Sequence, residues 1–246
     1  MKIIPVLDLL NGQVVHGFGG KRKEYKPLTN SVLVNSSEPL DVAKAYREKL
    51  DLNWIYIADL NLIQNIDVGV NKLKIAQIVA EQTIDIMMDA GCKTIDNVTD
   101  ILNQQIEQVI IGTETLASLD NLTKMVNVYG GEKIILSIDL FNGELLANNL
   151  PIQKYSVYDI VEFAENLSLK GLIVLELQKV GSQTGPISPT LMKIKDQVSN
   201  LNIFAGGGVR NITDLIELKE NQFAGALIAT AFHKGNITKE DLLKVL

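Results

Sequence analysis

The stretch "KIIPVLDLLNG", Lys2 to Gly12, returns later in the chain as "KIILSIDLFNG", Lys133 to Gly143. Seven of the eleven positions are identical, among them one aspartate, Asp8 in the first copy and Asp139 in the second. Each copy opens with a short Ile-rich run, which is typical of a strand covered on both faces, and closes with the turn signal Asn-Gly. The chain therefore contains the same strand and turn twice, 131 residues apart.

The repeat extends over the rest of the chain with an offset of 117 residues. This offset separates three further pairs at or just after the ends of apolar runs: Asp59 and Glu176, Gly91 and Gly208, and Thr113 and Thr230. The 14 residues by which the two offsets differ must lie between the first and second strands, where "HGFGGKRKEYKPLTN", residues 16–30, predicts a long loop. We interpret the chain as two similar halves, roughly 1–130 and 131–246.

Eight apolar runs alternate with eight helical patterns along the chain. The runs cover residues 2–8, 54–59, 84–88, 108–112, 133–139, 172–177, 202–206 and 225–229. The helical patterns cover residues 38–50, 69–82, 94–102, 118–129, 156–170, 188–198, 211–221 and 238–246, with N-caps expected at Ser118, Ser156, Ser188, Asn211 and Thr238. This order predicts a single-domain (β/α)8 TIM barrel over residues 1–246. An open doubly wound sheet is the alternative, and the count of eight strands favours closure.

Composition narrows the class of protein. The 246 residues are 46% hydrophobic with a net charge of −6, which argues against a nucleic-acid partner. The one cysteine, Cys92, excludes an internal disulfide and suits a reducing compartment. No apolar run is long enough to span a membrane, so we expect a soluble cytoplasmic protein. We expect no metal and no cofactor, because the spacing suggests neither a ligand cluster nor a dinucleotide-binding fingerprint. The sequence does not indicate an oligomeric state.

Asp8 and Asp139 are the predicted catalytic pair. In this fold, active sites lie at the C-terminal ends of the strands, and strands one and five face each other across the barrel mouth. Two facing carboxylates can serve one substrate as general base and general acid if their environments keep one ionised and the other protonated. The alternative is that each aspartate closes its strand end by accepting N–H groups of the following Asn-Gly turn.

Glycines after strand seven predict a phosphate site. "AGGGVR", residues 205–210, lets the backbone approach a ligand, and a following helix offers free N–H groups. The expected phosphate-binding residues are Gly206, Gly207 and Gly208 together with Ala229 and Thr230. A weaker symmetric site would use Gly91, Gly112 and Thr113. There Asp89 stands where the other half has Gly206, and it would repel an anion if its side chain points inward.

Two loops are candidates to cover the mouth. "GFGGKRKEYKP", residues 17–27, is either a solvated surface loop or a lid whose Lys21 or Arg22 reaches a phosphate on closing. "KVGSQTGP", residues 179–186, follows strand six and is a candidate second lid that carries Gly181 and Ser182.

"IIPVLDLLNGQVV" (3–15), "VIIGTETL" (109–116) and "AGGGVRNITDL" (205–215) resemble the HisA/HisF family of histidine-biosynthesis barrels, and the resemblance covers essentially the whole chain. It implies an aldose–ketose isomerase that performs an Amadori rearrangement of a phosphoribosyl-aminoimidazole. By the same analogy, Asp8 would take the proton from the ribose C2 and Asp139 would protonate the ring oxygen.

The chain departs from the family pattern around the expected substrate. Lys93 stands in place of an arginine, Glu176 in place of an aspartate, and Val180 in place of the aspartate of a loop. The residues expected to contact substrate or to belong to the covering loops are Lys21, Arg22, Asp59, Lys93, Glu176, Gly181 and Ser182. One alternative is a related barrel enzyme acting on another phosphorylated ribosyl-aromatic compound, for example in C1-cofactor synthesis. The other is a non-catalytic sugar-phosphate-binding barrel, against which the two retained aspartates argue.

Overall fold

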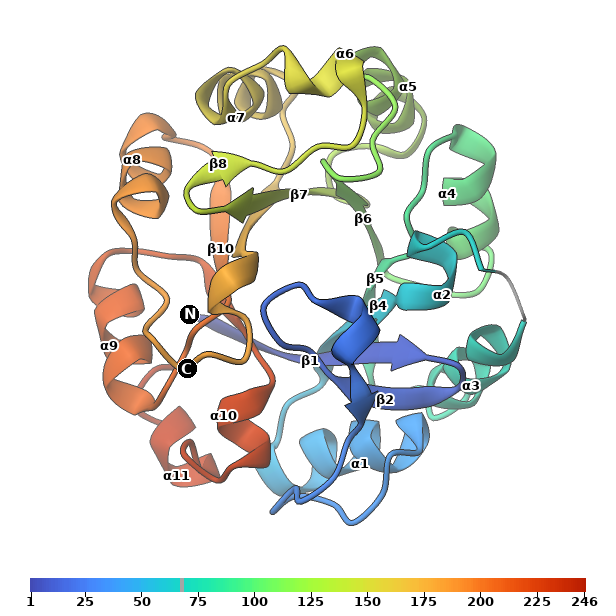
Figure 1. The fold of residues 1–246 in the computed structure, drawn as a ribbon, viewed down its shortest axis with the longest axis vertical. Coiled ribbons are helices and arrows are strands. Elements are labelled where there is room, and N and C mark those ends of the chain that lie inside the picture. The colour runs from blue at the N-terminus through green and yellow to red at the C-terminus, as the bar shows by residue number, and fades with distance from the viewer. Residues whose placement is uncertain (67–68) are drawn as a thin grey trace.

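The computed structural model describes residues 1–66 and 69–246 and confirms the predicted barrel (Figure 1). Its eight parallel strands are β1 (Lys2–Leu10), β4 (Trp54–Asp59), β5 (Asp85–Asp89), β6 (Gln108–Gly112), β7 (Ile134–Phe141), β9 (Gly171–Glu176), β10 (Asn202–Gly206) and β11 (Gly225–Ile228). Each strand pairs with the next, and β11 pairs with β1 from Lys2 opposite Gly225 to Pro5 opposite Ile228, which closes the ring.

Helices surround the barrel on all sides (Figure 1). They are α1 (Pro39–Leu50), α2 (Leu60–Ile63), α3 (Val70–Val79), α4 (Ile95–Leu102), α5 (Leu119–Tyr129), α6 (Leu150–Gln153), α7 (Val157–Asn166), α8 (Pro189–Gln197), α9 (Ile212–Glu220), α10 (Thr230–His233) and α11 (Lys239–Leu242). The five predicted N-caps are confirmed, since each side chain accepts a backbone N–H from its helix's first turn. The last helix is shorter than predicted.

Alternation along the strands sorts side chains into two cores. Ile4, Tyr56, Met87 and Ile135 belong to the cluster inside the barrel. Residues at the other parity, such as Ile57, pack in the larger cluster with the helices. The same alternation holds up to the ends of the strands. It places Asp8, Asp89, Gly112 and Asp139 on the side of the mouth. It places Asp59 and Glu176 on the side of the helices.

The repeated Asn-Gly pair is a hairpin turn rather than the end of a strand. β1 and β7 run two residues beyond Asp8 and Asp139, and each then pairs with a short antiparallel strand, β2 (Gln13–His16) or β8 (Glu144–Leu145). Asn11 and Gly12 have φ of 52° and 79°, and Asn142 and Gly143 have 54° and 79°. Two successive positive φ values are what a tight hairpin turn of type I′ requires. The prediction that the two aspartates are the last strand residues was therefore wrong by two positions.

The 14-residue difference between the halves corresponds to a loop over the barrel opening. It follows β2, contains a 3₁₀ turn at Arg22–Glu24, and returns through β3 (Lys26–Pro27). In Figure 1 this blue segment lies across the opening. Among the described residues, no helix combines the length and the apolar character needed to cross a membrane.

Candidate active site

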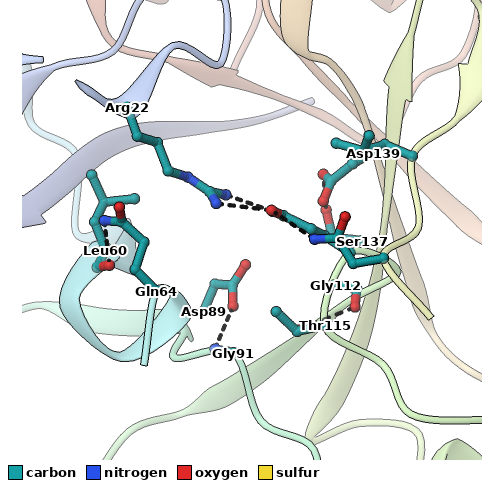
Figure 2. A network of polar contacts seen from close by, with 12 residues as sticks. Arg22, Leu60, Gln64, Asp89, Gly91, Gly112, Thr115, Ser137 and Asp139 are labelled. Carbon is teal, nitrogen blue, oxygen red and sulfur yellow. Dashed lines mark hydrogen bonds and ion pairs between the residues drawn. The ribbon is translucent and has the colours of Figure 1, made fainter. Parts of the chain in front are cut away.

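A cavity of about 170 Å³ opens at the C-terminal ends of the strands. Four acidic side chains line it: Asp8, Asp89, Glu114 and Asp139. Arg22 is the only cationic side chain of its lining within the described part of the chain. Figure 2 shows Arg22, Asp89 and Asp139 pointing into the same central space from three different elements. The mouth therefore carries far more negative than positive charge.

Asp139 is the more deeply buried member of the predicted catalytic pair, with 7% of its surface exposed. Ser137 Oγ donates to its Oδ1 at 3.4 Å, and its backbone N–H donates to Thr113 Oγ1 at 3.2 Å. Burial raises the pKa of Asp139 to about 8, and the charges of Asp89 and Glu114 act in the same direction. Its carboxyl group is therefore mostly protonated at neutral pH.

Asp8 lies beneath the loop that follows β2. A Cβ added to Gly17 would stand 2.6 Å from Asp8 Oδ2, so the glycine lets the loop backbone pack directly on the carboxylate. Burial raises the pKa of Asp8 to about 6, while the positive charge of Arg22 opposes part of this rise. Asp8 is thus mostly ionised at neutral pH. The two environments differ in the sense that an acid–base pair needs.

Asp89 and Glu114 are acids of the mouth, the first at the end of β5 and the second just after β6. Asp89, the last residue of β5, accepts the Gly91 N–H on Oδ1 at 2.9 Å and the Tyr56 hydroxyl on Oδ2 at 3.5 Å. Burial raises the pKa of Asp89 to about 6. A Cβ on Gly112 would stand 3.6 Å from Asp89 Oδ2 and 3.7 Å from Asp139 Oδ2, so both carboxylates face one small space.

Glu114 and Tyr56 were missed at the level of sequence. The repeat held a signal for Glu114, because the offset of 117 places Ala231 at the equivalent position of the second half. Glu114 in one half corresponds to Ala231 in the other, as Asp89 corresponds to Gly206. These two differences in charge distinguish the two ends of the mouth. Tyr56 lies on the inward parity of β4, which also could have placed it.

The loop of residues 17–27 is closed over the mouth in this structure. The Arg22 guanidinium binds the Glu114 carboxylate through two parallel hydrogen bonds, Nη1 to Oε1 at 2.8 Å and Nη2 to Oε2 at 2.5 Å (Figure 2). The Gly19 N–H donates to Val180 O at 3.0 Å, which joins this loop to the loop after β9. Arg22 thus reaches the mouth, as the lid alternative predicts, but its partner here is Glu114 in the loop after β6. Lys21 is exposed, and its Nζ lies 4.0 Å from Glu24.

The predicted phosphate site after strands seven and eight forms one end of the mouth. Gly207, Gly208, Ala229 and Thr230 line it, and Gly206 ends β10 beside them. Gly207 and Gly208 have φ of 91° and 85°, and a Cβ on Gly208 would stand 2.6 Å from Gly185 O. Only glycine suits such a backbone. The first turn of α10 begins at Thr230, where backbone N–H groups have no intrahelical acceptor.

The predicted symmetric phosphate site is not supported by the arrangement around β5 and β6. Asp89 points inward and already binds the Gly91 N–H that a phosphate would need. Lys93 points away from the mouth and donates to Asn65 Oδ1 at 2.9 Å. Thr113 donates to Leu146 O at 3.2 Å, which ties two loops together. Gly112 does lie at the mouth, but between two carboxylates.

Asp59 and Glu176, expected to contact substrate, lie behind the barrel wall. Asp59 Oδ1 accepts the Asn71 amide at 2.7 Å, and Glu176 accepts the Ser188 hydroxyl. Asn71 and Ser188 are themselves 117 residues apart, so each half uses an acid at the equivalent position to hold a helix that follows. Both acids lie on the side of the helices because successive side chains of a strand point to opposite faces of the sheet. Of the loop residues, Gly181 lines the mouth, whereas the Ser182 hydroxyl donates to Lys179 O at 2.7 Å.

We expect Asn71→Ala to reduce stability without changing the chemistry. The buried Asn71 amide accepts the Gly12 N–H at 2.8 Å and donates to Asp59, so its loss removes the acceptor of the buried Gly12 N–H and one donor of Asp59. The expected cost is about 1–3 kcal/mol in the free energy of unfolding, measured by urea denaturation. The value of kcat should stay within about twofold of wild type, since an outward-facing residue exerts no direct effect on catalysis. A large fall in kcat with unchanged stability would place the Asn71 and Asp59 pair in the active site instead.

Comparison with known proteins adds independent information. Residues 2–238 match the family model described as "Histidine biosynthesis protein". An uncharacterized protein of Methanocaldococcus jannaschii is 35% identical over 247 residues, covering 99% of this chain and 98% of the relative. A relative from Clostridium botulinum strain Alaska E43 is 28% identical over 246 residues, covering 100% and 99% of the two chains. It is named 1-(5-phosphoribosyl)-5-((5-phosphoribosylamino)methylideneamino) imidazole-4-carboxamide isomerase. A Clostridium acetobutylicum protein of the same name is 26% identical over 247 residues, with coverage of 100% and 99%.

Proposed function

Because the chain belongs to the family of histidine biosynthesis proteins, and several of its relatives are isomerases, we propose that it is a sugar-phosphate isomerase that converts an aminoaldose to an aminoketose by an Amadori rearrangement. The substrate class is a phosphoribosyl-aminoimidazole, by analogy with those relatives. The observation that carries this proposal is the pair Asp8 and Asp139, two inward-facing carboxyl groups with pKa values of about 6 and about 8 in one cavity.

Each step uses a group whose protonation state suits it. The protonated Asp139 donates to the ribose ring oxygen, the C1–O bond breaks, and the amine nitrogen's lone pair forms the C1–N double bond of an open-chain iminium, whose nitrogen takes that pair back in the next step. The ionised Asp8 then takes the proton from C2, and the electrons of that bond form the C1–C2 double bond of an enolamine. Return of a proton to C1 and loss of the proton of the C2 hydroxyl complete the aminoketose. The reaction only redistributes hydrogens, so two positioned carboxyl groups are sufficient for its proton transfers.

The rest of the mouth suits this chemistry. A phosphate at Gly207, Gly208 and Thr230 would anchor one end of the ribose and fix its position relative to the two aspartates. The loop held by Arg22 and Glu114 would keep water from the reactive iminium. A binder without catalysis is disfavoured, because burying two carboxyl groups in the path of an anion weakens binding and serves no purpose unless protons are transferred.

A second candidate is an isomerase or related barrel enzyme acting on another phosphorylated ribosyl-aromatic compound. The inward position of Asp89 favours it, because this side chain alters the end of the mouth opposite the Gly207–Gly208 site. The acid–base pair would serve this candidate in the same way.

The pH dependence of turnover tests the proposal. We expect kcat/KM to follow a bell shape with a maximum near pH 7 and limbs near pH 6 and 8. Below the lower limb Asp8 becomes protonated and can no longer take a proton, and above the upper limb Asp139 ionises and can no longer donate one. The assay follows product absorbance with purified protein and two aminoaldoses, the relatives' substrate and the single-phosphate adduct of ribose 5-phosphate with an aromatic amine. No turnover of either compound, or a flat profile from about pH 5 to about pH 9, would contradict the proposal.

A further inference from the structure

The two ends of the mouth are built from equivalent positions but carry opposite chemistry. At the end formed by β10 and β11, the repeat has Gly206 and Ala231. At the end formed by β5 and β6, it has Asp89 and Glu114. Both of these acids line the cavity, whereas no acidic side chain from the loops after β10 and β11 does so within the described residues. The repeated fold therefore provides one end open to an anion and one end closed to it.

The closed end carries negative charge, and its groups that could bind an anion already have other partners. The Gly91 N–H, equivalent to that of Gly208, donates to Asp89 Oδ1 at 2.9 Å. The one guanidinium of the lining, Arg22, is held by Glu114 through both of its terminal nitrogens. The Lys93 ammonium donates to Asn65 and does not line the mouth. A phosphate at this end would find neither a free backbone donor nor a free cation among these groups.

Acceptor atoms remain at the same end. Asp89 Oδ2 has only a long contact of 3.5 Å from the Tyr56 hydroxyl, and it faces the space beside Gly112 that Asp139 Oδ2 also faces. Absence of a side chain at Gly112 keeps this space open. A carboxylate in such a position accepts hydrogen bonds from amine, amide or amidine N–H groups. The chemistry of this end thus suits nitrogen rather than phosphate.

We propose that the substrate carries a single phosphate, bound at Gly207, Gly208 and Thr230, and that its other end is a nitrogen-bearing group which donates hydrogen bonds to Asp89. Asp89 and Glu114 are then the residues that determine specificity. This inference rests on the proposed function, because it uses the same phosphate site and the same cavity. It separates this chain from the Clostridium relatives, whose name contains two phosphoribosyl groups.

Binding measurements with a matched pair of compounds test this inference. The first probe is the two-phosphate aminoaldose named for the relatives. The second is 1-(5-phosphoribosyl)-5-aminoimidazole-4-carboxamide, which lacks the second phosphoribosyl group and ends in a free amine. Calorimetric titration of the full-length wild-type protein should give a Kd for the one-phosphate compound that is equal to or lower than that for the two-phosphate compound. Wild-type protein that binds the two-phosphate compound more tightly than the one-phosphate compound would overturn the inference.

Variants at the repeat-related positions supply the controls. The double change Asp89→Gly with Glu114→Ala gives the first half the residues of the second, and should tighten binding of the two-phosphate compound by about tenfold or more. Asp89→Asn with Glu114→Gln keeps the shapes and removes the charges, so it should move the ratio of the two Kd values in the same direction should the first variant fail to fold. A ratio unchanged in both variants would also overturn the inference.

Gly206→Asp separates this inference from the proposed function. It places an acid at the open end, where the nearest obstacle to a Cβ is the flexible Leu175 side chain at 2.8 Å. We expect it to weaken binding of both compounds by about tenfold or more. If wild-type protein bound neither compound, the phosphate site of the proposed function would be wrong, and this inference would fail with it. Tighter binding of the two-phosphate compound by wild type would overturn this inference alone.

Discussion

Asp8→Asn and Asp139→Asn are each expected to lower kcat by about a thousandfold, because positioned proton transfer contributes about 10² to 10⁴ to the rate of such reactions. Asparagine keeps the shape of the side chain and cannot exchange a proton at neutral pH. The Kd for the one-phosphate ligand should stay within about threefold, because the proposed phosphate site lies at Gly207, Gly208 and Thr230, which line another part of the cavity. Single-turnover kinetics and calorimetry would measure the two effects separately.

Asp85→Asn is the matched control for these two variants. Asp85 opens β5, whereas Asp89 ends it, so the control removes an acid from the opposite end of the barrel. It should leave kcat unchanged. Turnover within about tenfold of wild type in either active-site variant would show that the pair is not the acid and base. Loss of folding in either variant would instead identify that aspartate as a structural residue.

Asp139→Asn is also expected to stabilise the protein, and to do so increasingly as the pH rises. The pKa of Asp139 is raised from 3.8 to about 8 in the folded state. In the unfolded chain the carboxyl group is ionised above about pH 4, so between about pH 4 and pH 8 folding requires uptake of a proton. The stability of the wild-type protein therefore falls across this window, whereas asparagine does not titrate. The gain above pH 8 is about 2–6 kcal/mol, the upper value following from about 1.4 kcal/mol per unit of pKa.

Urea denaturation of both proteins at several pH values measures this difference. Near pH 3 the carboxyl group is largely neutral in both states, so the two proteins should have nearly equal free energies of unfolding. Their curves should separate steadily up to about pH 8 and then run parallel. A variant that is equally stable or less stable than wild type at pH 8.5 would show that the environment of Asp139 favours the ionised form. The expected opposition between activity and stability is common at catalytic sites.

The internal repeat made the barrel, the aspartate pair and the Gly207–Gly208 end predictable from the sequence. A parallel strand covered on both faces needs a continuous apolar run, so eight such runs alternating with amphipathic segments are visible without any tertiary information. A backbone φ near 90°, as at Gly207 and Gly208, requires glycine, and a run of glycines is visible in the sequence. The Asn-Gly pairs predicted the turns that follow Asp8 and Asp139, but not that each strand continues for two residues before its turn.

The alternation of residues along a strand also indicates whether an acid at its end faces the mouth or the helices, and this signal was missed at the level of sequence. Parity along β4 and β9 assigns Asp59 and Glu176 to the side of the helices, because Ile57 and Val174 two residues earlier belong to the outer core. The same count assigns Asp89 to the inside, behind Met87. Counting alternate residues along each strand to its end removes Asp59 and Glu176 from the expected site and adds Asp89.

Other features depend on the closed barrel and have no local signal. Arg22 and Glu114 are 92 positions apart and meet only because a loop from the first half crosses the opening. Burial raises the pKa of both Asp8 and Asp139, and charges carried by several different elements act on each to a different extent. The sequence by itself determined which strands and turns form and which residue types stand at their ends. Only the tertiary structure decided which of these side chains share one desolvated space, because electrostatic energies depend on distance and burial rather than on order along the chain.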